Sequence, residues 1–344
     1  MARRRGLTLV EVLIVMSIVA ILIAIGVPTV RALRESARRH ACGQQLRRIA
    51  LKLREYYEQK RRYPLSLRDL YSQGFVQEVS LLRCPSDPRR EANFDDPFYG
   101  YDLFYASRDP SESKDALAGG CAFHSGDRGL VVFLDGTVEE ARFDKAKLTS
   151  ATGQVEVRPR EKVEWVPAEV GMELRPGDAI RTGPGGRAEI AFFGETSKIE
   201  VLEDTILVIK LLLRDPDTLG LRRLLGLLNG SIWCDVDDNV YTEENNSFEV
   251  VTPSVVAGVR GTRFYISVTN EILLGKDIDG DGRKESIITY IYVSHGRVLA
   301  KFKGRRIRLR AQKGLLFKLR PKERFKFRAG WEGDEDHEDD ENGD

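Results

Sequence analysis

Several residue types that build catalytic and metal sites are scarce in this chain. There are four cysteines and four histidines among 344 residues, and no Cys-x-x-Cys pair. The cysteines are Cys42, Cys84, Cys121 and Cys234, and the histidines are His40, His124, His295 and His337. A zinc site needs clustered ligands, and the sequence shows none at short spacing. The chain is therefore expected to hold no zinc, with His124 as an ordinary loop residue.

Motifs of catalysis are missing as well. Ser125 follows His124, but no nucleophile elbow surrounds it. Gly183–Gly186 lacks the lysine and hydroxyl residue of a phosphate-binding loop and is typical of a β-turn. The sequence therefore predicts no enzymatic activity.

The net charge of the chain is also close to zero, at +1, so it favours neither an acidic nor a basic class of partner. The charges are segregated, however: Lys301–Arg328 is basic and Glu332–Asp344 is acidic. Basic residues interleaved with apolar ones can bind DNA or anionic glycans. They also form the solvated face of strands whose other face is buried, and we favour this interpretation, so nucleic acid is not expected as a partner. The acidic tail either folds over that face or is disordered.

A long apolar run is present at the N-terminus. Arg3–Arg5 and Gly6 precede an almost unbroken apolar stretch that ends at Val27, before Pro28. Roughly 20 apolar residues are enough to cross a hydrocarbon core of ~30 Å. Glu11 interrupts this stretch, and an ionised group there costs ~3 kcal/mol on insertion scales, so it needs a partner.

The order Gly6, Leu7, Glu11 resembles the prepilin signal of type IV pilins and type II secretion pseudopilins. The resemblance implies that prepilin peptidase cuts after Gly6 and methylates Leu7, and that Glu11 pairs with the Leu7 amine of a neighbouring subunit. It also implies a single-pass inner-membrane protein with a periplasmic or extracellular body. A cleaved secretory signal or a plain membrane anchor are the alternatives.

Helical periodicity continues beyond the apolar run and predicts one helix from about Leu9 to Lys60, which Tyr63-Pro64 ends. A short helix is expected near Leu67–Gln73, and Asp135-Gly136 predicts a hairpin turn. The order of the Cys84–Pro88 loop and the Phe133–Val138 segment resembles bacterial pilin-like heads.

An extracytoplasmic body permits disulfides. Cys42, Cys84 and Cys121 all lie in the first body segment. We expect one bridge, between Cys84 and Cys121; burial as free thiols is the alternative.

Residues 151–330 change to short alternating apolar runs, which predict an all-β body, either a sandwich or a short solenoid. The predicted strands are Ala188–Phe193, Lys198–Leu202, Ser231–Val236, Ser247–Thr252, Gly261–Thr269, Ile287–Ser294 and Arg297–Phe302. Four segments resemble the FecR domain: Gly171–Gly183, Gly186–Ile190, Val251–Pro253 and Val259–Phe264. The resemblance implies an extracytoplasmic regulatory or binding module with an unknown ligand. Leu211–Leu228 departs from that pattern and is expected to form a helix or hairpin over the sheet.

An acidic loop supplies the main candidate for a cofactor. Asp277, Asp279, Asp281, Arg283 and Glu285 occupy alternate positions around two glycines. Calcium prefers several hard oxygens from a tight turn, so these residues are a candidate Ca²⁺ site. Position 12 of the loop is Ile288, which excludes a complete EF-hand, and a solvated Asp-Gly turn is the alternative.

Together these features predict an α+β chain: a transmembrane helix with a small pilin-type head, followed by an all-β FecR-like domain. The expected segments are a leader (1–6), a membrane-spanning segment (7–28), a stalk and head (29–148), a FecR-like domain (151–330) and an acidic disordered tail (331–344). The expected function is that of a minor pilin or pseudopilin-like subunit. Its partners would be prepilin peptidase and other subunits of a type IV filament or type II secretion system. The alternatives are a membrane-tethered FecR-type sensor and a calcium- or glycan-binding adhesin.

Overall fold

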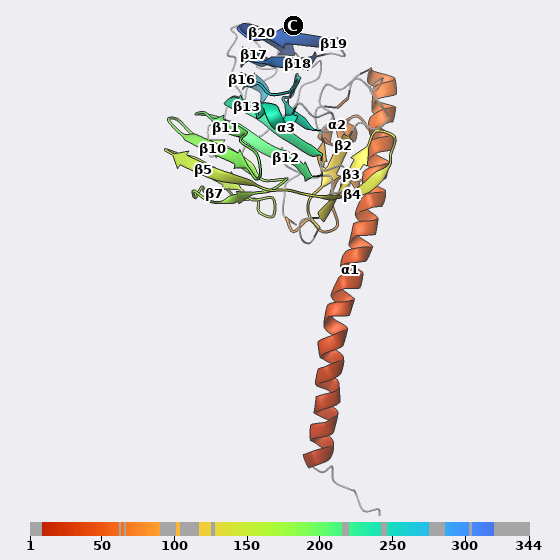
Figure 1. Ribbon diagram of the computed structural model, residues 1–344. Coiled ribbons are helices and arrows are strands. Elements are labelled where there is room, and N and C mark those ends of the chain that lie inside the picture. Colours follow the sequence, from red (N-terminus) through yellow and green to blue (C-terminus); the bar gives the residue numbers. More distant parts are fainter. Residues whose placement is uncertain are drawn as a thin grey trace, which may run out of the picture.

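The computed structural model describes residues 9–61, 63–64, 67–89, 101–103, 117–124, 128–214, 220–241, 246–274, 286–302 and 305–319. Within these ranges the chain forms a long helix, a small head packed along one end of it, and a large β body beside the head (Figure 1). This arrangement confirms the predicted α+β class.

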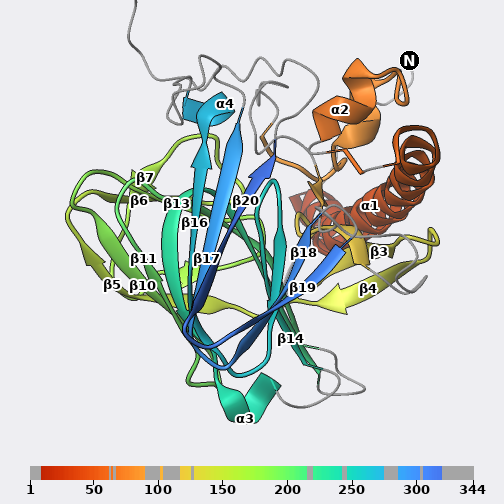
Figure 2. The same cartoon turned by 90° about the horizontal axis from the view of Figure 1, so that it is seen from above.

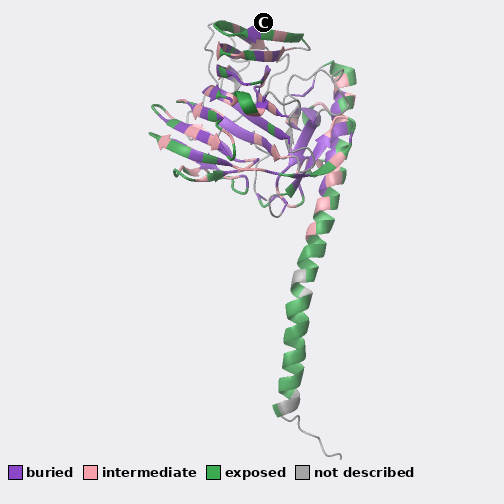
Figure 3. Ribbon diagram, in the orientation of Figure 1, coloured by how far each residue is buried: buried purple, intermediate pink, exposed green. Residues whose placement is uncertain are grey.

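Helix α1 runs from Leu9 to Lys60, as predicted. The side chains from Val12 to Ile25 are all exposed, whereas the other end of the helix buries one face in the head (Figure 3). The buried residues recur every three or four positions, which places them on one side of a helix. They are Cys42, Leu46, Ile49, Leu53 and Tyr56.

The head wraps this buried face. Its sheet is antiparallel, with the strand order β1-β2-β3-β4. The core of the head includes buried residues from α1, α2, β2 and β3. The elements are α2 (Leu67–Ser72), the 3-10 helix η1 (Val79–Leu82), β1 (Asp102–Leu103), β2 (Leu117–Cys121), β3 (Arg128–Phe133) and β4 (Val138–Arg142). The short helix and the hairpin turn are confirmed. In that turn Gly136 has a φ of +90°, and the Asp135 carboxylate accepts the Thr137 amide at 2.8 Å.

The β body is a sandwich of two sheets that share one long strand (Figure 2). The first sheet has the order β7-β6-β9-β12-β13-β14-β15-β18-β19, and the second has the order β8-β5-β10-β11-β13-β16-β17-β20. The strands before β13 are β5 (Ala146–Thr152), β6 (Val155–Arg158), β7 (Val166–Pro167), β8 (Glu173–Leu174), β9 (Ala179–Thr182), β10 (Arg187–Phe192), β11 (Lys198–Val201) and β12 (Ile206–Arg214). The others are β13 (Leu221–Asp235), β14 (Ser247–Val251), β15 (Val256–Val259), β16 (Arg263–Asn270), β17 (Ile287–His295), β18 (Arg297–Phe302), β19 (Arg305–Arg310) and β20 (Lys313–Leu319), with the short helices α3 (Asp238–Tyr241) and α4 (Glu271–Leu274).

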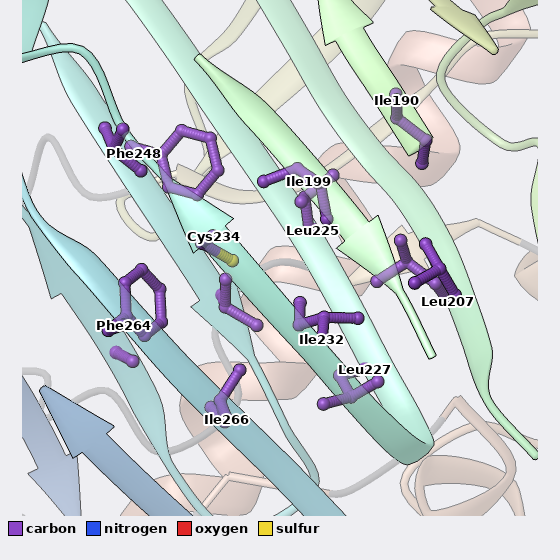
Figure 4. Packing of buried hydrophobic residues seen from close by; sticks show 14 of the residues in the cluster. Ile190, Ile199, Leu207, Leu225, Leu227, Ile232, Cys234, Phe248, Phe264 and Ile266 are labelled. Carbon is purple, nitrogen blue, oxygen red and sulfur yellow. The ribbon is translucent and has the colours of Figure 1, made fainter. Parts of the chain in front are cut away.

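Strand β13 passes from one sheet to the other near Gly230. Before this residue β13 pairs with β12 and β14, and from Gly230 onward it pairs with β11 and β16. Gly230 has a φ of +85°, and a Cβ atom there would overlap Thr205, so the crossing depends on glycine. Figure 4 shows the core that results, to which Leu207 and Leu225 contribute from the first sheet and Ile199 and Phe264 from the second.

All seven predicted strands are confirmed, and of the two expected architectures the structure has the sandwich. The expectation of a hairpin at Leu211–Leu228 is confirmed, because the consecutive strands β12 and β13 pair antiparallel, but the expected position over the sheet is wrong. The described residues of this stretch belong to β12 and β13, which lie inside the first sheet rather than over it. Its leucines are buried because this sheet is covered on one face by the second sheet and on part of the other face by the head.

A separate apolar cluster joins the head to the β body. Val131 of β3 and Phe143, just after β4, pack with Leu211, Leu224 and Val256 of the first sheet. All five side chains are at most 7% exposed. This shared core attaches the head to the β body through buried contacts.

Candidate functional site

The N-terminal signal lies at the free end of α1. Gly6 and Leu7 lie outside the described residues, and Glu11 lies in the first turn of the helix. Within the described part of the chain, α1 is the helix long and apolar enough to cross a membrane, with a segment of mean hydropathy 2.7. At 1.5 Å per residue its 52 residues extend about 78 Å, which is more than twice the hydrocarbon thickness.

A cluster of three thiols and an imidazole lies inside the head. Cys42 projects from α1, Cys84 begins the loop after η1, Cys121 ends β2, and His124 follows three residues later. One ligand atom from each residue lies within 4.8 Å of all the others. The four residues are at most 3% exposed. Three separate segments of the chain thus converge on one buried point.

Hydrogen bonds orient the members of this cluster. The Nε2 atom of His124 lies 3.7 Å from the Cys84 sulfur, and its Nδ1 atom lies 2.9 Å from Oε1 of Glu35 on α1. The backbone amide of Ser86 donates to the Cys84 sulfur at 3.3 Å. Cys84 is therefore the sulfur that receives the most hydrogen bonds in the cluster.

The protonation of the cluster follows from these contacts. Hydrogen bonds from the Cys121 and Cys42 thiols lower the pKa of Cys84, with smaller contributions from His124 and Ser86, and together they outweigh burial. Burial raises the pKa of Cys121. Burial lowers the pKa of His124, but its hydrogen bonds with Cys84 and Glu35 outweigh this effect and raise it overall. The site therefore favours a thiolate at Cys84, which is the form of cysteine that binds metals.

The structure corrects two expectations about these residues. Cys84 and Cys121 form no disulfide: all four cysteines are buried free thiols. His124 is in a loop but is fully enclosed, and the ligands that seemed scattered are brought together. One short-range signal was overlooked, because Cys121 and His124 are three residues apart, a spacing typical of half a metal site. His40 and His295 are exposed, and His337 lies outside the described residues.

Most residues of the Val251–Pro253 and Val259–Phe264 segments, which resemble the FecR domain, are buried in the β body. The hydroxyl of Thr252 donates to the Val255 carbonyl at 3.1 Å, and Ser254 lies 2.7 Å from the Thr289 hydroxyl. The Thr262 hydroxyl lies 2.9 Å from the Arg297 carbonyl, and Phe264 enters the core. These residues fix the connections between strands of the β body.

Two parts of the chain match models of known protein families. Residues 1–27 match the prokaryotic N-terminal methylation motif, and residues 178–305 match the FecR protein family. The chain joins a prepilin-type methylation motif to a FecR domain.

Two solved structures of a candidate anti-sigma factor from Parabacteroides distasonis resemble part of the chain. Each has 14% sequence identity and a TM-score of 0.30, and the match covers 41% of this chain and 59% of the solved chain. The matched region is thus less than two thirds of those proteins. None of the curated proteins is significantly similar to this chain.

The FecR domain carries a row of aromatic side chains on the outer face of its second sheet. Trp233, Tyr265 and Tyr292 are direct neighbours on β13, β16 and β17. The ring centres of Trp233 and Tyr265 lie 5.4 Å apart, and those of Tyr265 and Tyr290 lie 6.3 Å apart. All four rings are at least partly exposed. An accessible aromatic row of this kind offers a flat, partly apolar surface with hydroxyl groups along it.

The acidic loop of the FecR domain, with Asp277, Asp279, Asp281, Arg283 and Glu285, lies outside the described residues. The two ends of this loop are joined at its base. Ser286 donates its amide to the Glu271 carboxylate at 2.9 Å, and the Glu271 amide donates to the Ser286 carbonyl at 3.1 Å. The calcium site remains a prediction.

Proposed function

We propose that this chain is a minor pilin-like or pseudopilin-like subunit that is processed by prepilin peptidase and presents a FecR domain outside the cytoplasm. The observation that carries the proposal is the methylation motif over residues 1–27, which overlaps the first half of one continuous helix that ends at Lys60. The exposed apolar end of α1 suits a membrane, and the other end forms part of the core of a small head.

The size and attachment of the β body favour a minor subunit. A body of sixteen paired strands beside the head would crowd neighbouring copies in a helical filament. The cluster of Val131, Phe143, Leu211, Leu224 and Val256 holds the FecR domain against the head, so it cannot swing away without exposing apolar surface. A position at a tip, or one occupied by few copies, removes this crowding.

Glu11 is the residue assigned to assembly. A lone carboxylate in a membrane segment costs ~3 kcal/mol and requires a partner. The methylated amine of Leu7 on a neighbouring subunit would supply the opposite charge within the low dielectric of the helix bundle.

Mass spectrometry of the mature N-terminus tests processing. The expected species begins with N-methylated Leu7 in cells that have prepilin peptidase, and with the unprocessed leader in a Gly6→Leu variant. A wild-type chain that retains Arg3–Arg5 would overturn the proposal and leave a plain anchor.

Shearing of surface filaments tests assembly. Glu11→Ala should be processed normally but lost from the filament fraction, whereas Glu58→Ala, an exposed acidic residue farther along α1, should still co-purify. A wild-type chain that stays monomeric in membranes, regardless of the peptidase, would instead support a membrane-tethered FecR-type sensor.

A second candidate function, binding of a glycan by the FecR domain, is favoured by the aromatic row. Sugar rings present flat C–H faces that pack on aromatic rings. The row also carries tyrosine hydroxyls, of which those of Tyr265 and Tyr292 already donate to Ser231 and Gln312. Retention on a panel of immobilised bacterial glycans should fall at least tenfold in Tyr290→Ala and remain unchanged in Phe193→Ala, an exposed aromatic residue outside the row. Equal retention of both variants would contradict this function.

A further inference from the structure

We propose that Cys42, Cys84, Cys121 and His124 bind one structural Zn²⁺ ion in the head. This site is independent of the proposed filament role, because it depends only on the convergence of four side chains. Three sulfurs and one imidazole nitrogen form one of the usual ligand sets of structural zinc, and thiolates select zinc over the hard cations calcium and magnesium.

The spacing of the ligand atoms suits a tetrahedral ion. With zinc–sulfur bonds of ~2.3 Å, the ligand atoms of a tetrahedral site lie about 3.8 Å apart. The four atoms here already lie within 4.8 Å of one another, so inward movements of about 1 Å or less complete the coordination. Rotation of cysteine side chains about χ1 is enough for such movements.

A second observation, the position of Glu35, points to the same ligand. Histidines that bind zinc almost always direct their other ring nitrogen to a carboxylate or carbonyl, which fixes the ring and its tautomer. His124 has this arrangement: Nδ1 faces Glu35 at 2.9 Å, and Nε2 faces the cluster, 3.7 Å from the Cys84 sulfur. The Ser86 amide donates to the same sulfur at 3.3 Å, and hydrogen bonds of this kind orient metal-binding groups.

The surroundings indicate a structural site. All four ligands are buried, so no coordination position is open to a substrate or water. The ligands come from α1, the loop after η1, and the end of β2 with the residues that follow it. An ion at this point would join the stalk helix to the head in the way that a pair of disulfides does in other small domains. Because binding free energy at such sites is folding free energy, removal of the ion should destabilise the head.

Cys234 provides an internal control. It is also fully buried as a free thiol, but it lies in the apolar core of the β body on β13. It belongs to no group of metal ligands among the residues that the structure describes.

Metal analysis of the detergent-solubilised full-length protein tests the proposal. Mass spectrometry of the metal content should give about one zinc per chain for wild type and for Cys234→Ser. Zinc should be lost from Cys84→Ser, and Glu35→Gln should bind it 10- to 100-fold more weakly. Wild-type protein without zinc after expression in zinc-supplemented medium, or Cys84→Ser with a full zinc content, would overturn the assignment.

Two measurements on the wild type keep the test valid if Cys84→Ser fails to fold. Alkylation of the native protein should spare Cys42, Cys84 and Cys121 until a zinc chelator is added. Replacement of zinc by cobalt(II) should give the intense visible absorption of a tetrahedral cobalt–thiolate centre. A disulfide between any two of these cysteines in the isolated protein, or the absence of that absorption, would contradict the proposal.

Discussion

Arg223 and Glu195 form a fully buried ion pair, with Nε and Oε1 3.0 Å apart and both side chains 0% exposed. A second guanidinium nitrogen of Arg223 binds Asp144 at 2.9 Å, and Glu195 accepts the Tyr241 hydroxyl at 2.7 Å. Asp144 follows the last strand of the head, so this network ties the start of the β body to the centre of its first sheet.

Removal of one partner of this pair should be strongly destabilising, because the other charge is left buried. We expect Arg223→Met to lower the free energy of unfolding by about 3–5 kcal/mol. The matched variant Arg222→Met replaces the exposed neighbouring arginine and should change the free energy of unfolding by no more than ~0.5 kcal/mol. Urea denaturation followed by tryptophan fluorescence distinguishes the two, and equal effects would show that burial of the pair is unimportant.

Two glycines of the head should respond in opposite directions to alanine. A Cβ atom at Gly129 would overlap the Phe143 ring and the Cys121 carbonyl, so Gly129→Ala should destabilise the head. At Gly43, inside α1, a Cβ atom would meet Val138 and Leu130 at ordinary distances of 3.7 and 3.8 Å. Gly43→Ala should therefore stabilise the protein by about 1 kcal/mol through helix propensity. Thermal denaturation provides the measurement, and a raised melting temperature for Gly129→Ala would contradict the packing described here.

Stability should depend on pH through Asp178, which is 6% exposed at the start of the FecR match. Burial raises its pKa to about 6, although the amides of Arg160 and Arg175 donate to it and oppose the shift. A carboxyl group whose pKa is higher in the folded state contributes stability below its unfolded pKa of 3.8, and this contribution is lost as the pH rises through 6.

Between pH 4 and pH 7 the loss attributable to Asp178 is therefore about 2 kcal/mol. Asp178→Asn removes the titrating group, so its unfolding free energy should fall less over this interval than that of the wild type. The check is a series of denaturation curves at several pH values for both proteins. Parallel pH dependences would refute the assignment to Asp178.

The acidic loop should bind calcium because Asp277, Asp279 and Asp281 supply hard oxygens in a Gly-containing turn. Calorimetric titration of the full chain should show binding that Asp279→Ala abolishes. Asp235→Ala, which removes an exposed carboxylate from β13, should leave it intact. The absence of heat for the wild type at millimolar calcium would leave only a solvated turn.

Much of the fold could be predicted because the relevant signals are local. The bounds of α1 follow from apolar and then amphipathic periodicity, and the hairpin of β3 and β4 follows from Asp135-Gly136. Alternation of Phe264, Ile266 and Val268 with polar residues predicted β16. The position of Leu211–Leu228 inside the first sheet was less predictable, because its short leucine-rich segments have no period that separates a buried strand from a helix.

The sequence by itself determined the long apolar helix, the prepilin-type motif, the positions of most strands and the turn residues, since each depends on neighbours a few positions away. Only the tertiary structure decided which polar groups meet. Cys42, Cys84 and Cys121 are far apart along the chain, and Arg223 on β13 reaches Glu195 in the turn between β10 and β11. Such contacts arise from the packing of α1 on the head and of the head on the β body, which no local pattern encodes.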